Sequence, residues 1–110
     1  MPVDERGRVC LDAGETVVFH VASWKLDRVN VAPRGATQRI FKNALVLKLD
    51  EVDGVAGEYE YRVTSERLAR AMAPFLKSDA VGLRSVIVHV EGQGRLRSLE
   101  FSTMPRGSSL

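Results

Sequence analysis

Alternation of apolar and polar residues over five stretches predicts a protein built mainly of β-strands. In the first stretch, GETVVFHVASW, the side chains of Val17, Phe19 and Val21 would share one face of a strand. In RIFKNALVLKLDEV the phenylalanine and three leucines likewise fall on one face, and EYEYRVT alternates strictly. The five predicted strands cover residues 14–24, 39–52, 58–64, 85–92 and 94–104.

One helix interrupts the strands, because the hydrophobic period changes at Ser65. In SERLARAMAPFLK the apolar residues recur at helical spacing, and Ser65 or Thr64 is a suitable N-cap. Pro74 cannot bond to the carbonyl four residues back, so we expect the helix to kink or restart there. The predicted buried face consists of Leu68, Met72 and Phe75, and the predicted exposed face carries Arg67 and Arg70.

Two turn signals separate the first three strands. Pro33 and Gly35 in VNVAPRGATQ predict a loop after the first strand, since proline fixes φ and glycine permits positive φ. Residues 29–31 also fit a separate short strand. Asp53-Gly54 is the strongest hairpin dipeptide in the chain and predicts a tight turn before the third strand.

The length and composition fit one globular domain. A chain of 110 residues with 45% hydrophobic residues can bury roughly two thirds of its unfolded surface. No apolar run approaches the ~20 residues that span a bilayer, and the N-terminus lacks a secretory signal, so we expect a cytoplasmic protein without a membrane partner. We assign residues 1–13 to an N-terminal arm, 14–104 to the domain and 105–110 to a disordered tail.

Positive charge is concentrated between the first two predicted strands. The chain has a net charge of +2, but residues 25–42 contain five basic side chains and one acidic one. Residues 43–61 have the opposite balance, with one basic and five acidic side chains. A local patch of one sign matters more for binding than the total charge does. The basic segment (residues 24–42, starting at Trp24) is therefore the candidate for contact with an acidic partner.

The order of elements over residues 14–104, β-β-β-α-β-β, resembles that of the OB-fold, a five-stranded Greek-key barrel. The resemblance implies an all-β to α+β structure, an antiparallel OB-like barrel with one helix between strands three and four. It also implies that the loops after strands one and four hold an oligonucleotide or oligosaccharide. A different small α+β sheet, with the helix laid across one face, fits the same order.

The resemblance implies that two arginine pairs, Arg34 with Arg39 and Arg95 with Arg97, meet at one ligand face. Their planar guanidinium groups suit contacts with phosphate and stacking on bases. We therefore expect a small single-stranded nucleic-acid-binding protein, DNA-binding or RNA-binding, or the binding subunit of a larger complex. Tyr59 and Tyr61 should face the core, which leaves Glu58 and Glu60 outside to repel phosphate from the third strand. The expected contact residues are Trp24, Lys25, Arg28, Arg34, Arg39, Lys42, Arg95 and Arg97.

Signals for an enzyme are weak. His20 and His89 lie within predicted strands without neighbours at metal-ligand spacing, and Cys10 is the only cysteine, which excludes an internal disulfide and a Cys-rich metal site. We expect no catalytic activity, metal or cofactor. The alternative function is a protein–protein module or homo-oligomer, in which acidic residues 50–60 pair with the basic segment of a neighbour.

Overall fold

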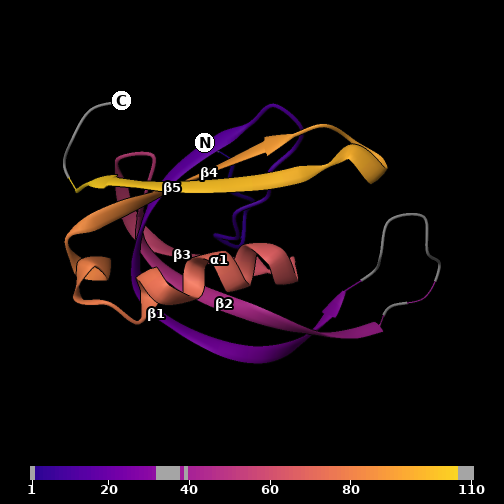
Figure 1. Ribbon diagram of the computed structural model, residues 1–110, viewed down its shortest axis with the longest axis horizontal. Helices are drawn as coiled ribbons and strands as arrows, with labels where there is room; N and C mark the ends of the chain where they lie inside the picture. Colours follow the sequence, from indigo (N-terminus) through magenta and orange to yellow (C-terminus); the bar gives the residue numbers. More distant parts are fainter. Residues whose placement is uncertain (1, 32–37, 39, 107–110) are drawn as a thin grey trace.

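The computed structural model describes residues 2–31, 38 and 40–106, and Figure 1 shows the arrangement of its elements. Five strands and one α-helix follow one another in the order that the sequence predicts, with a short 3₁₀ turn on either side of the fourth strand. The strands are β1 (Thr16–Val31), β2 (Ile40–Val52), β3 (Val55–Val63), β4 (Arg84–Glu91) and β5 (Ser98–Pro105). The helix is α1 (Glu66–Leu76), and the 3₁₀ turns are η1 (Asp79–Gly82) and η2 (Gly94–Leu96).

The strands form a single antiparallel sheet in the order β3-β2-β1-β4-β5. The first three strands are joined in sequence, and β4 returns by way of α1 to lie beside β1, which is a Greek-key arrangement. The prediction of an antiparallel five-stranded sheet with one helix is confirmed. Within the described residues no ladder joins β3 to β5, so the sheet is open and these two strands are its edges.

The core lies between the inner face of the curved sheet and α1. Leu68 and Met72 on α1 are buried and Phe75 packs against them half-buried, whereas Arg67 and Arg70 are exposed, as predicted. The Ser65 hydroxyl accepts a hydrogen bond from the Leu68 N–H at 3.2 Å and caps the helix. From the sheet the main contributors are Val17, Phe19, Leu47, Val52, Val86, Val88 and Val90.

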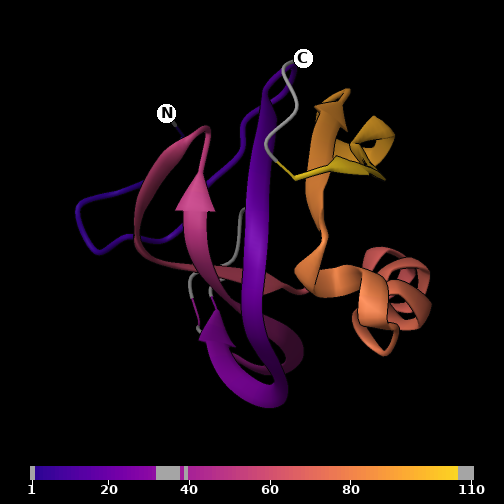
Figure 2. The same ribbon diagram turned by 90° about the vertical axis from the view of Figure 1, so that its left-hand side faces the viewer.

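The N-terminal segment 2–13 is part of this core. Val9 and Leu11 are buried among the core side chains, although we expected Cys10 to precede the ordered domain. The Val9 N–H donates to the Glu60 carbonyl at 2.8 Å, and Arg97 Nη2 donates to the Leu11 carbonyl at 3.1 Å. The segment thus runs from the β3 edge of the sheet to the β4–β5 end, and in Figure 2 its first turn projects on the side opposite α1.

Several predicted boundaries were wrong, for identifiable reasons. Residues 29–31 continue β1 instead of forming a loop, because they pair with Ile40–Lys42. The helix does not break at Pro74 but continues to Leu76, since proline there removes only one bond in the last turn. Residues 105 and 106 are ordered, with Pro105 paired to Arg84; the rest of the predicted disordered tail lies outside the described residues.

The predicted hairpin turn at Asp53-Gly54 is confirmed. Both residues have positive φ, 49° and 81°, which is the backbone of the turn that matches the twist of the flanking strands. The Asp53 carboxylate also accepts a hydrogen bond from the Val18 N–H at 3.0 Å, which ties the turn to β1. Glycine at position 54 is therefore required by backbone conformation. No helix in the described part of the chain is both long enough and apolar enough to cross a bilayer.

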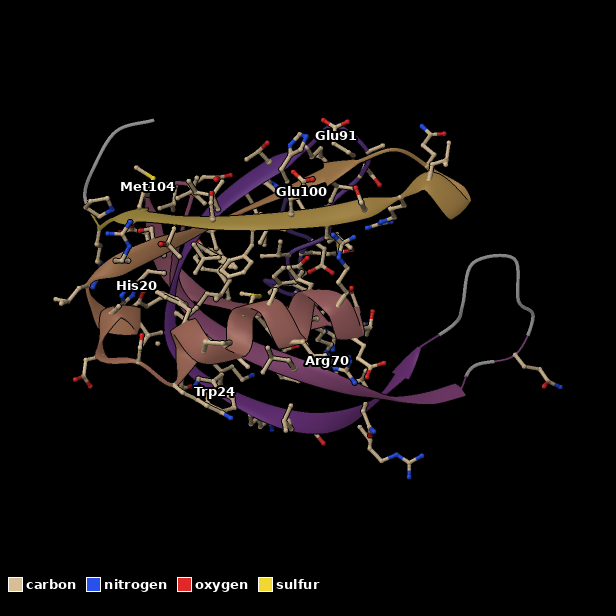
Figure 3. The ribbon with its side chains drawn as sticks, viewed as in Figure 1. His20, Trp24, Arg70, Glu91, Glu100 and Met104 are labelled. Carbon is tan, nitrogen blue, oxygen red and sulfur yellow. The ribbon has the colours of Figure 1, made fainter. Side chains whose placement is uncertain are left out.

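His20 links the sheet to the connection that follows α1. Its Nδ1 lies 2.7 Å from Asp50 Oδ1 and its Nε2 lies 3.2 Å from the Gly82 carbonyl, and the side chain is buried (Figure 3). The bonds join β1, β2 and η1 at one point. His20 is thus a buried structural histidine.

Replacing His20 by alanine should destabilise the fold by about 1–3 kcal/mol, because the protein loses two hydrogen bonds made by a buried side chain. His89→Ala is the matched control. His89 is half-exposed on a sheet face, where cross-strand pairs contribute under about 1 kcal/mol. Urea unfolding of both variants, followed by circular dichroism, checks this. Equal losses would show that the Asp50 and Gly82 bonds do not stabilise the fold.

Candidate nucleic-acid interface

The described ends of the basic segment belong to a two-stranded ribbon, formed by residues 24–31 of β1 and 40–47 of β2. β4 pairs with β1 only at Thr16–Phe19, and β3 pairs with β2 only from Leu45 onwards. The register of β1 on β2 shifts between His20 and Ser23, and such bulges bend a strand and increase its twist. The ribbon therefore leaves the sheet and extends to the right-hand end of the molecule in Figure 1.

The side chains of the ribbon alternate between two faces. Trp24 and Leu26 pair with Leu47 and Leu45, whose side chains belong to the core, so they share the inner face with Arg28. Lys25 pairs with Val46 and belongs to the outer face. The basic residues thus occur on both faces of the ribbon. The outer face also carries a separate small apolar cluster, Val29, Ala44 and Val46.

Trp24 lies at the base of the ribbon. It is half-buried, packs against the core cluster, and Figure 3 shows it on the side of β1 that faces α1. Next to it, Lys25 Nζ lies 3.4 Å from Asp27 Oδ2 on the exposed outer face. The Arg28 N–H donates to the Asp27 carboxylate, and this bond, with Lys25, lowers the pKa of Asp27. Asp27 is the one acidic side chain in the basic segment.

The structure describes only some of the other predicted contact residues. The β4–β5 connection, with η2, lies at the same end of the molecule as the end of β1 and the beginning of β2 (Figure 1). Arg97, however, uses one guanidinium N–H to hold the Leu11 carbonyl. Arg34 and Arg39 lie outside the described residues, and so do the side chains of Lys42 and Arg95.

The outer face of β2 and β3 carries a cationic cluster that the sequence did not reveal. Lys48 Nζ lies 2.8 Å from Glu60 Oε1, and Arg62 Nε and Arg8 Nε lie 2.9 and 3.6 Å from Glu60 Oε2. These cations come from three segments that are distant in sequence. They border a cleft of about 610 Å³ whose charged lining residues are Arg6, Arg8, Lys48, Arg62, Asp50, Glu58 and Glu60.

This cluster changes the expectation for β3. We predicted that Glu58 and Glu60 would repel phosphate from the third strand, but Glu60 is surrounded by three cations. The hydrogen bond from Lys48, together with Arg62, holds the pKa of Glu60 below its ordinary value of 4.5. Tyr61 is buried as predicted, which raises its pKa to about 12, and its ring meets Phe19 edge-on at 5.7 Å.

Glu60 should stabilise the fold in a pH-dependent way. Its lowered pKa means that its contribution is present above its unfolded-state pKa and is lost as the pH falls through the folded-state value. Glu60→Gln should therefore unfold more easily than the wild type at pH 7, and the difference should shrink below about pH 4.5. Urea unfolding at several pH values measures this. If the difference in unfolding free energy between Glu60→Gln and the wild type stayed constant from pH 7 to below about pH 4.5, the ion pairs would not stabilise the fold.

The acidic segment 50–60 is largely engaged within the chain. Asp50 binds His20, Asp53 binds the Val18 N–H, and Glu60 has its three cations. These internal partners use the carboxylates that the alternative function assigned to a neighbour's basic segment.

One further polar chain crosses β1 and β4. Thr16 Oγ1 lies 2.7 Å from His89 Nδ1, and His89 Nε2 lies 2.6 Å from Glu91 Oε1. In catalytic triads the carboxylate is buried, whereas the Glu91 side chain is 65% exposed, so the Thr16–His89–Glu91 series departs from triad geometry. Partial burial raises the pKa of the Cys10 thiol, the opposite of a nucleophilic cysteine. The described residues contain no cluster of three metal-ligating side chains.

Comparison of the chain with protein-family models, curated proteins and solved structures found no match.

Proposed function

We propose that this protein is an OB-like single-stranded nucleic-acid-binding protein that contacts its ligand with the ribbon. The observation that carries the proposal is the ribbon itself. The ribbon carries Lys25 and Arg28, leaves the sheet and extends to one end of the molecule, and the sequence adds three further basic residues between Val31 and Asn43. A local excess of cations on a projecting element is the usual electrostatic signature of phosphate binding.

The sheet topology supports the comparison with the OB-fold. Strand order β3-β2-β1-β4 with the helix before β4 is the Greek-key order, and OB-folds are partly open Greek-key barrels. In that fold the ligand contacts the loops after strands one and four. In this chain the end of β1, the beginning of β2 and the connection from β4 to β5 all lie toward the right-hand end of the molecule in Figure 1.

A groove beside the ribbon offers room for bases. It has a volume of about 410 Å³ and lies between the inner face of the ribbon and the start of α1. Leu26, Leu45 and Ala69 supply apolar surface, and Asn43 and Thr64 supply neutral hydrogen-bonding groups. Such a lining suits unpaired bases, whereas the basic side chains of the ribbon suit the phosphates. Single strands should therefore be preferred over duplex.

The salt dependence of binding tests the proposal. With about four phosphates neutralised, log affinity should fall against log salt with a slope near −3, at roughly −0.7 per contact for single strands. Arg34→Ala with Arg39→Ala should flatten the slope by about 1 to 1.5 units.

The matched control for charge is Lys77→Ala with Arg106→Ala. This variant also removes two cations, but from the end of the molecule where α1 and β5 terminate (Figure 1). It should change the slope much less. Equal flattening by both double variants would mean that the total charge and not the ribbon binds the oligonucleotide. Fluorescence anisotropy with a labelled oligothymidine measures both slopes.

A further inference from the structure

One long edge of β1 pairs with no strand in the described part of the chain. Beyond Phe19, β4 no longer pairs with β1, so residues 24–31 are hydrogen-bonded to β2 on one side and to no described strand on the other. In Figure 1 this edge follows the lower border of the molecule. An unpaired strand edge is a template for pairing with another strand, and a two-stranded ribbon gains stability from a third. The free edge is therefore a potential interaction surface.

A large apolar side chain lies on this edge. Leu26 is 77% exposed, between Lys25 and Asp27, which are also exposed. The local sequence is Trp24-Lys25-Leu26-Asp27-Arg28. One position from Leu26 there is a basic residue on one side and an acidic residue on the other. Two positions from Leu26 there is an aromatic residue on one side and a basic residue on the other. The segment is thus complementary to its own reverse.

We propose that this edge is a self-association surface, on which β1 of a second copy pairs antiparallel with Leu26 opposite the partner's Leu26. Because opposed residues in an antiparallel pair share a face, Lys25 then lies opposite the partner's Asp27, twice by symmetry. Trp24 lies opposite the partner's Arg28, a cation–π combination. Cross-strand pairs of opposite charge or of apolar side chains stabilise a sheet, so each opposed pair favours the association.

The register is selected by charge. Moving the symmetry axis by one residue pairs Lys25 with the partner's Lys25, or Asp27 with the partner's Asp27. A half-step shift is excluded by geometry, because it would oppose residues such as Lys25 and the partner's Arg28, whose side chains lie on opposite faces. Like charges directly opposite one another destabilise a pair of strands. The axis through Leu26 avoids all these repulsions and also covers the exposed leucine with its counterpart.

This pairing would join two ribbons into one continuous four-stranded sheet, β2-β1-β1-β2, with a two-fold axis at Leu26. The inference does not depend on nucleic-acid binding, because it uses the hydrogen-bonding edge of β1 and the five residues around Leu26. The alternative function pairs the acidic residues 50–60 of one copy with the basic segment of another. The present proposal instead pairs the β1 edges of two copies symmetrically.

Sedimentation analysis of the wild type and two charge variants tests the proposal. Lys25→Asp should place two pairs of aspartates opposite one another, and Asp27→Lys two pairs of lysines, so each should raise the dimer dissociation constant at least tenfold. Both residues are exposed, and circular dichroism checks that each variant is folded. A monomeric wild type at high micromolar concentration, or charge variants that dimerise like the wild type, would overturn the proposal.

Mixing the two variants provides the decisive result. In a mixed dimer, the two aspartates of one protomer lie opposite the two lysines of the other, so the mixture should form heterodimers although each variant alone is monomeric. The double variant Lys25→Asp with Asp27→Lys should likewise dimerise again. A mixture that stays monomeric would show that the register is wrong and overturn the proposal.

A crosslink locates the axis independently of charge. In a Cys10→Ser background, Leu26→Cys should form an intermolecular disulfide under mild oxidation, because the two copies of the residue face each other. Val55→Cys in the same background is the control, since Val55 is also exposed but begins β3. Crosslinking of both variants to the same extent would mean random collision and contradict the proposed axis.

Discussion

Replacing Leu11 by alanine should destabilise the protein by about 2–5 kcal/mol, which is the usual cost of removing a buried leucine side chain from a core. Leu11 lies in the N-terminal segment, yet only 6% of its surface is exposed. It packs beside Val9 and Leu68, between the two edges of an open sheet. The segment thus covers core surface that no strand ladder covers.

Asp12→Ala is the control for Leu11→Ala, because the Asp12 side chain is exposed and should contribute within about 0.5 kcal/mol. Urea unfolding followed by circular dichroism gives both values. If Leu11→Ala cost no more than Asp12→Ala, the N-terminal segment would be a peripheral arm rather than part of the core.

Leu68→Ala should have an effect of the same size, about 2–5 kcal/mol. Leu68 is 2% exposed and lies on the face of α1 that covers the sheet, next to Met72. Truncation would leave a cavity between the helix and the sheet, which neighbouring side chains fill only in part. The free energy of unfolding from urea titration measures the loss.

Arg70→Ala is the control on the opposite face of the helix. Arg70 Nη2 lies 2.6 Å from Glu66 Oε1, but both side chains are largely exposed, and such i,i+4 pairs contribute about 0.3–0.5 kcal/mol. A comparable loss for Arg70→Ala and Leu68→Ala would mean that α1 presents a different face to the sheet.

The elements were predictable where a periodic pattern and a local signal agree. α1 has both, with Ser65 as its cap and Leu68 and Met72 on one face, and Asp53-Gly54 has the backbone that its turn requires. The N-terminal segment was not predictable in this way. Val9 and Leu11 alternate over too few residues to show a period, and their burial depends on a gap between β3 and β5 that exists only in the folded sheet.

The candidate site was predictable in charge but not in geometry. The excess of basic residues between Trp24 and Lys42 is visible in the sequence, whereas the extension of β1 to Val31 depends on pairing with β2. The cluster around Glu60 could not be found by local inspection, because Arg8 and Lys48 are 40 positions apart in the chain.

The two proposals place the ribbon in contact with two different partners. Pairing of β1 edges uses Lys25, Leu26 and Asp27 near the base of the ribbon, where Leu26 also lines the inner groove beside α1, and leaves the far end of the ribbon to the oligonucleotide. A dimer would hold two basic ends in one particle and so raise the avidity for long single strands. Arg34→Ala with Arg39→Ala should therefore change the salt dependence of oligonucleotide binding without changing association, whereas charge variants at Lys25, which is itself an expected contact residue, should change both.

Titration of a labelled single-stranded oligonucleotide with the protein tests the central claim, nucleic-acid binding through the ribbon, most directly. At about 50 mM salt, where even non-specific binders respond, anisotropy should rise at micromolar protein and more strongly than with a duplex of the same length. Trp24, the only tryptophan, should report the same binding by a change in its fluorescence. Unchanged anisotropy and unchanged Trp24 fluorescence under these conditions would contradict the claim.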